Sequence, residues 1–485
     1  MKRRALNRLG LTIFALAFTV LQFGPAHAAV QPSFDTIRVQ DGDVARLYQA
    51  SILWTPLVLP LPDGSAWSFF TAQLKLPTEP GADPTLSNFK VFASRFDPAS
   101  ATWSPATALP GEISFGPTGV VDSQGTVHLV YTIRANLDPA SFGSMVYIKT
   151  TPEGGWTGPT LVAASETAGH QLSPDLAIDA NDGLHIAWQD QRSVTDEQRA
   201  ADASNADVFV SDLNPDGTWS EPVQLSERTA ESVSNSSRPK LLADGERLVA
   251  VWSIYSPEIG LESATHIEWS TRPVSDAAGW GEPQMMFDQG ETLIGGRFLD
   301  AEANAGGDIA VVYGRRTATE NQLYLQRLPS GTSEWSEPSL IAAGNRGSYP
   351  NIALGGDGAL YIVYNLVDSG LSVQVGAISV APGETSAGAE VALTIGEEGQ
   401  QGIAAVSVGA TGRVWVMYLH ELPGKPSPTE ARVLRGALVE SLPVVAVEAE
   451  IPAAATPEAE ATQKADLRAI AHTLYGQTVA ASRGQ

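Results

Sequence analysis

Several arginines stand at positions from which they could hold an anionic group. Arg238, Arg297 and Arg315 each fall at or beside a connection between predicted strands, and Tyr349 follows one repeat later. A guanidinium group donates two parallel hydrogen bonds to a carboxylate or a sulfate, so arginines that converge can hold such a group specifically. The sequence therefore predicts a ligand-binding mouth. The alternative is that each arginine forms a salt bridge that only holds the fold together.

A long polar loop adds further candidates. The stretch "QDQRSVTDEQRAADASNA" (189–206) carries Asp190 and Arg192, and His420 follows a later apolar strand. Loops that differ between otherwise similar units are where binding usually resides. The predicted ligand-binding residues are therefore Asp190, Arg192, Arg238, Arg297, Arg315, Tyr349 and His420.

Metal and cofactor sites are not predicted. The chain has no cysteine, and no histidine pair stands at a metal-ligand spacing. The acidic stretch "DANDG" (179–183) lacks the bidentate glutamate of a calcium loop and is interpreted as a hairpin turn. No nucleophile elbow, phosphate loop or dinucleotide fingerprint is present. We expect no cofactor and assign no catalytic residue.

A turn that contains Trp and Pro recurs along the chain and indicates a repeat. Its five copies are "TWSP" 102–105, "GWTGP" 155–159, "TWSEP" 218–222, "GWGEP" 279–283 and "EWSEP" 334–338. Trp at equivalent positions of five repeats predicts packing between units rather than five active sites.

A second motif lies between these turns. It begins with Pro and an alternating strand, continues through an Asp/Gly turn, and ends in an apolar strand with a terminal aromatic residue. Clear examples are "SPDLAIDANDGLHIAW" (173–188), "RPKLLADGERLVAVW" (238–252) and "YPNIALGGDGALYIVY" (349–364). We expect the inner strand to start after Pro, and Pro to open the outer edge strand after each Trp turn.

Four strands in each of seven repeats predict an all-β fold, a β-propeller of four-stranded antiparallel blades. Seven blades are expected, with six as the alternative. The seventh repeat (401–439) lacks its own outer strand. Either "FDTIRV" (34–39) or "PVVAVE" (443–448) is expected to supply that strand and close the ring.

The two ends of the chain differ from the repeats. Residues 1–28 combine a basic start, a short apolar run and "AHA" at 26–28, which predicts a secretory signal cleaved after Ala28; an uncleaved membrane anchor is the alternative. The propeller is expected over 29–440. Residues 441–485 are predicted to be a Pro/Ala/Glu-rich linker and a short helix.

The charge limits the partners. The chain has a formal net charge of −24, and loss of 1–28 leaves 26 basic against 54 acidic residues. Such an acidic protein is repelled by nucleic acid and by anionic lipid. We expect an extracellular or cell-surface monomer whose partner is a glycan or a protein, with no nucleic-acid partner and no membrane insertion after signal cleavage.

The repeats resemble the BNR or Asp-box propellers, the superfamily that includes the sialidases. The resemblance covers roughly 50–440. It rests on the Asp/Gly hairpin turn, the strand-end aromatic residue, and Asp216, Gly217 and Trp219. The family box is S-x-D-x-G-x-x-W. Relative to Trp219, Asn214 and Asp216 stand where that register has Asp and Gly, so the box is degenerate.

The resemblance also implies what a sialidase site would contain: an early aromatic-Arg-Ile-Pro motif, an arginine triad, an aspartate acid/base, and a tyrosine nucleophile paired with glutamate. The nearest match to the first motif is "QRLP" (326–329), which lacks the aromatic residue and comes late in the chain. We therefore predict a non-catalytic propeller that binds a glycan or protein ligand. A sialidase-like glycoside hydrolase is the alternative.

Overall fold

The computed structural model describes nineteen stretches of the chain: 35–37, 44–47, 56–74, 89–111, 113–134, 143–163, 170–195, 206–226, 235–255, 263–277, 279–287, 293–294, 299–316, 321–344, 346–367, 373–388, 390–394, 399–421 and 432–439. Every regular element in these stretches is a β-strand. None of the described residues forms a helix with the length and hydrophobicity needed to span a membrane. The predicted signal, the linker and the C-terminal helix lie outside the described residues.

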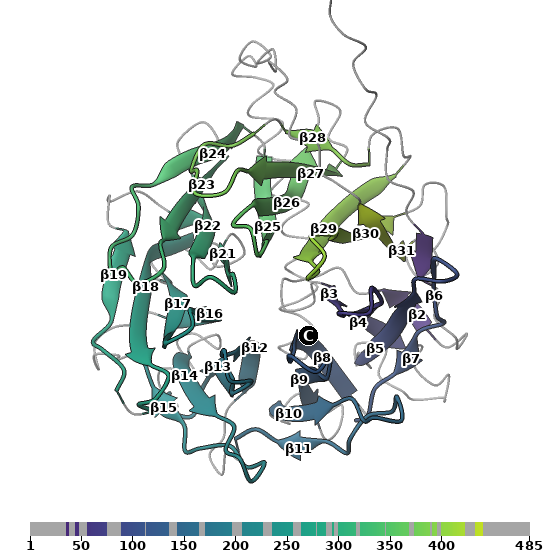
Figure 1. The fold of residues 1–485 in the computed structure, drawn as a ribbon, viewed down its shortest axis with the longest axis horizontal. Coiled ribbons are helices and arrows are strands. Elements are labelled where there is room, and N and C mark those ends of the chain that lie inside the picture. Colours follow the sequence, from purple (N-terminus) through teal and green to yellow (C-terminus); the bar gives the residue numbers. More distant parts are fainter. Residues whose placement is uncertain are drawn as a thin grey trace, which may run out of the picture. The chain divides into compact units, whose positions relative to one another are not determined.

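The strands form seven antiparallel blades around a central channel, as Figure 1 shows. The innermost strands, in blade order, are β3 (Leu57–Pro60), β8 (Ile113–Val121), β12 (Gln171–Ile178), β16 (Asn235–Ala243), β21 (Leu299–Ala303), β25 (Arg346–Leu354) and β29 (Gln400–Val408). The second strands are β4 (Ala66–Leu74), β9 (Val127–Arg134), β13 (Leu184–Asp190), β17 (Arg247–Tyr255), β22 (Ile309–Arg316), β26 (Leu360–Val367) and β30 (Val414–Glu421). The expected seven-bladed propeller is confirmed.

The outer half of each blade consists of a third strand and an edge strand. The third strands are β5 (Phe89–Asp97), β10 (Ser144–Lys149), β14 (Asp207–Asp212), β18 (Ser263–Pro273), β23 (Asn321–Leu328), β27 (Val373–Val380) and β31 (Arg432–Val439). The outer edge in blades 1–6 is formed by β6 (Thr102–Trp103) with β7 (Thr107–Ala108), then β11 (Thr160–Leu161), β15 (Val223–Gln224), β19 (Gln284–Phe287), β24 (Ser339–Gly344) and β28 (Val391–Ala392). Strands β11, β15, β19 and β24 begin directly after a proline, as expected for edge strands.

Two additional short strands extend the sheets. β2 (Val44–Leu47) pairs with β4, and β20 (Leu293–Ile294) pairs with both β18 and β22, so that it joins blades 4 and 5.

The ring is closed by the beginning of the chain. β1 (Asp35–Ile37) pairs antiparallel with β31, with Thr36 opposite Arg435, and is the outer strand of blade 7. Of the two expected sources of this strand, the N-terminal one is therefore correct. Strands from the two ends of the fold share one sheet, which removes a free edge and ties the first blade to the last.

Seven hydrophobic clusters fill the seven interfaces between neighbouring blades. The Trp turns contribute to them as expected: four of the rings pack against an aromatic residue of the preceding blade, and Trp280 packs against the cluster between blades 3 and 4. The ring centroids lie 5.4 Å apart for Trp156 and Trp67, 5.7 Å for Trp219 and Tyr147, and 5.8 Å for Trp335 and Trp269. These tryptophans serve packing.

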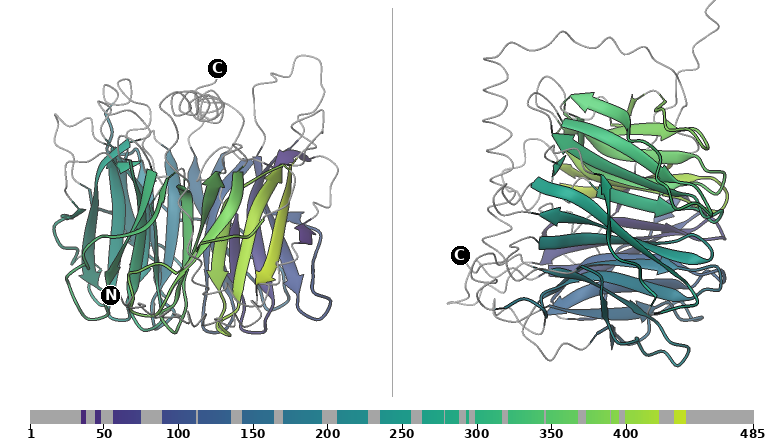
Figure 2. Two further views of the ribbon diagram at one scale, coloured as in Figure 1. Left: turned by 90° about the horizontal axis from the view of Figure 1, so that it is seen from above. Right: turned by 90° about the vertical axis from the view of Figure 1, so that its left-hand side faces the viewer.

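The short hairpin turns lie together on one face of the propeller (Figure 2) and are held by their own side chains. Asp179 Oδ1 accepts hydrogen bonds from the backbone N–H groups of Asn181 (2.7 Å) and Gly183 (2.9 Å). Its other oxygen lies 3.2 Å from His185 Nε2, whose ring also contacts Asp212 at 2.6 Å. The hairpin-turn interpretation of "DANDG" is confirmed.

One expectation about the inner strands is wrong. β8, β12, β16 and β25 do not start after their proline. They begin three to four residues before it, and the pairing register shifts at that point, as between Leu172 and Asp175. A β-bulge is the other place where a strand tolerates proline, because the bulged residue makes no ladder hydrogen bond.

Candidate functional site

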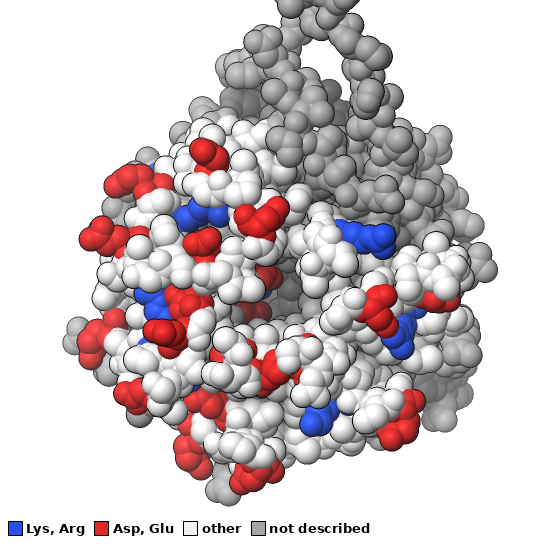
Figure 3. Space-filling view, viewed as in Figure 1, with Lys and Arg blue, Asp and Glu red and all other residues white. Residues whose placement is uncertain are grey.

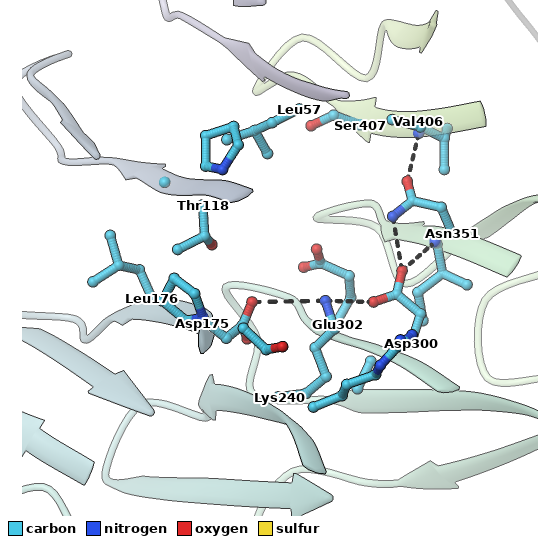
Figure 4. Close-up of a pocket in the computed structure, with 18 of the residues that line it drawn as sticks. Leu57, Thr118, Asp175, Leu176, Lys240, Asp300, Glu302, Asn351, Val406 and Ser407 are labelled. Atoms are coloured by element: carbon cyan, nitrogen blue, oxygen red, sulfur yellow. Dashed lines mark hydrogen bonds and ion pairs between the residues drawn. The ribbon is translucent and has the colours of Figure 1, made fainter. Parts of the chain in front are cut away.

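The innermost strands of all seven blades line one cavity in the central channel, with a volume of ≈ 260 Å³ (Figure 4). The lining runs along the inner strands, from the bulges of β12, β16 and β25 to residues next to the hairpins such as Glu302 and Ser407. In an antiparallel blade the bulged end of the inner strand is also the end that carries the loop between the second and third strands. Ser173, Arg238 and Tyr349 therefore lie at the end of the cavity toward the variable loops.

Three residues at the bulges hold an unusual backbone conformation. Ser173, Arg238 and Tyr349 have φ of 51°, 52° and 57°, and all three line the cavity. Gly116 occupies the equivalent position in blade 2, with φ of 64°. The left-handed region disfavours residues with a Cβ atom, and strain of this kind gathers at functional sites.

Deeper in the channel, an ion-pair chain joins three blades. Lys240 Nζ of β16 lies 2.7 Å from Asp300 Oδ1 of β21 and 3.6 Å from Asp175 Oδ1 of β12. Burial alone would lower the pKa of the Lys240 ammonium group, but Asp175 and Asp300 outweigh that effect and raise the pKa above its ordinary value. Lys240 is therefore the positively charged centre of the chain.

Hydrogen bonds extend this chain toward blade 7. Asp300 Oδ2 accepts bonds from the Asn351 side-chain amide and the Ile352 backbone N–H, each 2.9 Å long. Asn351 Oδ1 accepts a bond of 2.6 Å from the backbone N–H of Val406. The polar contacts thus run through blades 3 to 7, whereas blades 1 and 2 present Leu57 and Thr118 at the same register.

Glu302 lies beside this chain and projects into the cavity (Figure 4). It stands two residues after Asp300 on β21, and its side chain is open to the cavity. The surrounding channel wall, with Asp300 and Asp175 nearby, raises the pKa of its carboxyl group to about 8. Glu302 is therefore largely protonated at neutral pH while the cavity holds no additional positive charge.

The structure brings two of the predicted ligand-binding residues together. Arg238 and Tyr349 both line the cavity, from blades 4 and 6. Arg297 lies outside the described residues, and so do residues 196–205 of the long loop 189–206.

The other four predicted residues do not line this cavity. Asp190 accepts hydrogen bonds from Trp188 Nε1 (2.7 Å) and Arg192 Nε (2.9 Å), and the Arg192 guanidinium group lies 5.1 Å from the centre of the Phe209 ring. Arg315 is 5% exposed and lies over the Tyr324 ring, and His420 is 3% exposed. The contacts of these residues stabilise the blades in which they lie. Their role in ligand binding stays a prediction.

Asp175, Lys240, Asp300 and Glu302 are not among the residues predicted from the sequence. A signal was present. The residue after the proline in "SPDL", "RPKL" and "YPNI" is polar in an otherwise apolar strand, and it is this residue that faces the channel. An alignment of the repeats by that proline places Asp175, Lys240 and Asn351 in one ring.

The sialidase geometry is only partly present. Among the described residues, the cavity is lined by one arginine, Arg238, together with Tyr349 and Glu302. An arginine triad is not assembled there by the part of the chain that the structure describes.

No protein-family model matches the chain, and no curated protein matches its sequence. Solved structures do match. An ulvan lyase is 9% identical over 84% of this chain and 96% of its own, with a TM-score of 0.52. Polysaccharide lyase Uly1 is 10% identical over 86% and 95%, with a TM-score of 0.51. The NanB sialidase from Streptococcus pneumoniae is 12% identical over 84% and 70%, with a TM-score of 0.42. At these identities the likeness to the two lyases shows the propeller fold alone.

Proposed function

We propose that this propeller binds a glycan at the loop-rich end of its central channel, outside the cytoplasm, and does so without catalysing a reaction. The observation that carries the proposal is the placement of Arg238 and Tyr349. Both hold a left-handed backbone at equivalent positions of different blades, and both line the same cavity. Glycine would relieve the strain at either position, so the side chains have a use that outweighs it.

The chemistry of these two residues suits a sugar. A tyrosine ring packs on the apolar C–H face of a pyranose, and its hydroxyl group forms hydrogen bonds. A guanidinium group donates several hydrogen bonds in a fixed geometry to hydroxyl or carbonyl oxygens. The volume of ≈ 260 Å³ suits one or two small groups of a larger ligand whose remainder lies at the mouth. Two neighbours of the same fold are polysaccharide lyases, which supports a glycan as the class of ligand.

A glycan array tests the proposal. We expect the wild-type protein to bind a limited set of glycans, and Arg238→Gly and Tyr349→Gly to lose at least about tenfold in affinity for them. Glu153→Gln, in an exposed turn of blade 2, is the matched control and should bind as the wild type does. An array without a bound glycan, or variants that bind unchanged, would contradict the proposal.

A sialidase-like hydrolase is the second candidate, because Tyr349 and Glu302 line the same cavity as Arg238. Turnover of a fluorogenic sialoside that disappears in Tyr349→Phe would favour this candidate over simple binding. Lack of turnover by a protein that binds glycans would exclude it.

A further inference from the structure

Glu302 breaks the pattern of its repeat. The strand registers place it opposite Ala310, one residue pair before the hairpin. The same position in the other blades holds Leu59, Val120, Ala177, Leu242, Ala353 and Ser407. Five of these six residues are aliphatic, so the fold itself does not require a carboxyl group there. A residue that departs from a structural pattern without an evident gain in stability points to function.

The two aspartates beside Glu302 are already paired, and Glu302 is not. Asp300 accepts hydrogen bonds from Asn351 and Ile352 and forms an ion pair with Lys240. Asp175 accepts a hydrogen bond of 2.9 Å from the Leu241 backbone N–H and also faces Lys240. Among the described residues, none forms a direct hydrogen bond or ion pair with the Glu302 carboxyl group. It is therefore the acid of the channel that is left for a ligand.

The charge around Glu302 favours a cation. The groups that face it are Asp175, Asp300 and Lys240 of the channel wall, with Arg238 and Tyr349 also lining the cavity. Lys240 and Arg238 together balance the charges of Asp175 and Asp300, so among these groups an ionised Glu302 carries the charge that has no counterpart. A ligand cation would supply the missing positive charge and let Glu302 ionise. An anionic sugar would instead add a negative charge beside Glu302 and keep its carboxyl group protonated.

The wider surface adds to this preference. The whole chain has a formal net charge of −24, and the face with the short hairpin turns, seen in Figure 3, presents many acidic side chains around a central hollow. Uronates and sulfated sugars are repelled by such a field, whereas amines are attracted.

We propose that Glu302 binds the ammonium group of an amino sugar, so that the glycan taken by the channel is a basic one. This inference rests on the glycan-binding role proposed above and names the class of ligand. Arg238 and Tyr349 then contact the hydroxyl groups and the ring face of the sugar, while Glu302 recognises the amine.

A pair of matched oligosaccharides tests it. The probes are a β-1,4-linked glucosamine tetrasaccharide and its fully N-acetylated counterpart, which differ only in the charge and acylation of the amines. At pH 7 we expect the full-length wild-type protein to bind the amine form about tenfold more tightly or better in calorimetry, because an ion pair replaces a neutral contact. Glu302→Gln should lose that preference.

A control variant tests whether the net charge of the protein alone accounts for the preference. Glu153→Gln changes the net charge by the same amount at an exposed turn, and it should keep the full preference for the amine form. A circular dichroism melt checks that both variants are folded.

The outcomes separate this inference from the function on which it rests. Equal binding of the two probes, or an unchanged preference in Glu302→Gln, overturns the role of Glu302. Glycan-array binding to acidic or neutral sugars without binding of the amine probe overturns the basic class and leaves glycan binding intact. The lack of any glycan ligand overturns both.

Discussion

Asp300 Oδ2 accepts a hydrogen bond of 2.9 Å from the backbone N–H of Ile352, which belongs to the next blade. The same bond recurs from Leu241 to Asp175 and from Val406 to Asn351. In each case a side chain at the first channel-facing position of one inner strand accepts from the following residue of the neighbouring strand. This repeated hydrogen bond links neighbouring inner strands along the channel wall. Lys240 forms ion pairs with the two carboxylates.

Lys240→Met is expected to destabilise the fold. Its removal leaves Asp175 and Asp300 without a counterion, at a cost of about 2 kcal/mol, because the ammonium group is partly open to solvent. The loss should be smaller near pH 4 than at pH 8, because burial raises the pKa of Asp175 and favours its neutral form at the lower pH. Thermal melts of wild type and variant at both pH values measure it. A loss that is the same at both would show that the ion pairs are not its source.

Glu302→Gln is expected to stabilise the protein at alkaline pH. The pKa of Glu302 is about 8 in the fold against an ordinary value of 4.5. Between these values the folded state holds a proton that the unfolded state has lost, so wild-type stability falls as pH rises. Glutamine stays neutral and avoids this fall. At pH 4.5 the variant should have the same melting temperature as the wild type. At pH 8.5 its melting temperature should be higher by on the order of 1 °C, since access to solvent weakens the effect. A lower melting temperature at pH 8.5 would contradict the proposed state of Glu302.

Binding of the amine probe is expected to displace a proton from Glu302. At pH 6 the sugar amine and Glu302 are both protonated, so formation of the ion pair releases about one proton per site. Calorimetry in two buffers of different ionisation enthalpy counts that proton. The affinity of the wild type should also rise by up to about tenfold from pH 6 to pH 7. Neither effect should occur in Glu302→Gln, and a proton released by that variant would assign the titration to another group.

Removal of β1 is expected to weaken the whole ring. Residues 35–37 form the outer strand of blade 7 through β31, while the predicted cleavage after Ala28 would leave them in the mature protein. A chain that begins at residue 41 should melt several degrees lower and with less cooperativity, because blade 7 then has a free edge. Addition of a peptide with residues 32–40 should restore part of the loss. An unchanged melt would show that closure does not depend on β1.

The architecture could be predicted from the sequence because it is repeated. The Trp turns and the Asp/Gly hairpins fix the strand order, and both impose their geometry locally. The position of β1 was one of two alternatives, since pairing between distant segments depends on the closed ring rather than on local pattern. The bulge at Pro174 and its equivalents was missed, because the proline marks the same place whether a strand starts there or bends there.

The candidate site was only partly predictable for a related reason. Arg238 and Tyr349 were found from their position in the repeat, and the structure brings them to one cavity. Asp190 and Arg192 looked like loop residues, but they form hydrogen bonds with each other at the end of β13. Glu302 stands inside a strand, where the alternation of residues alone does not tell a side chain packed between blades from one that enters the channel.

The left-handed backbone at the cavity can be tested at its glycine. Gly116→Ala is expected to cost about 1 kcal/mol, since φ is 64° and alanine disfavours that region. Equilibrium unfolding in urea measures it. An unchanged free energy of unfolding would mean that the bulge tolerates a Cβ atom without strain, and the reason given for the presence of Arg238 and Tyr349 would fail.

The most direct test of the central claim is to measure glycan affinity and melting temperature together on Tyr349→Gly. If the tyrosine is kept for binding in spite of its backbone, the variant should bind its glycan at least about tenfold more weakly and melt no lower than the wild type. Unchanged affinity together with a melting temperature several degrees lower would make Tyr349 a structural residue and would contradict the proposal that this cavity is the binding site.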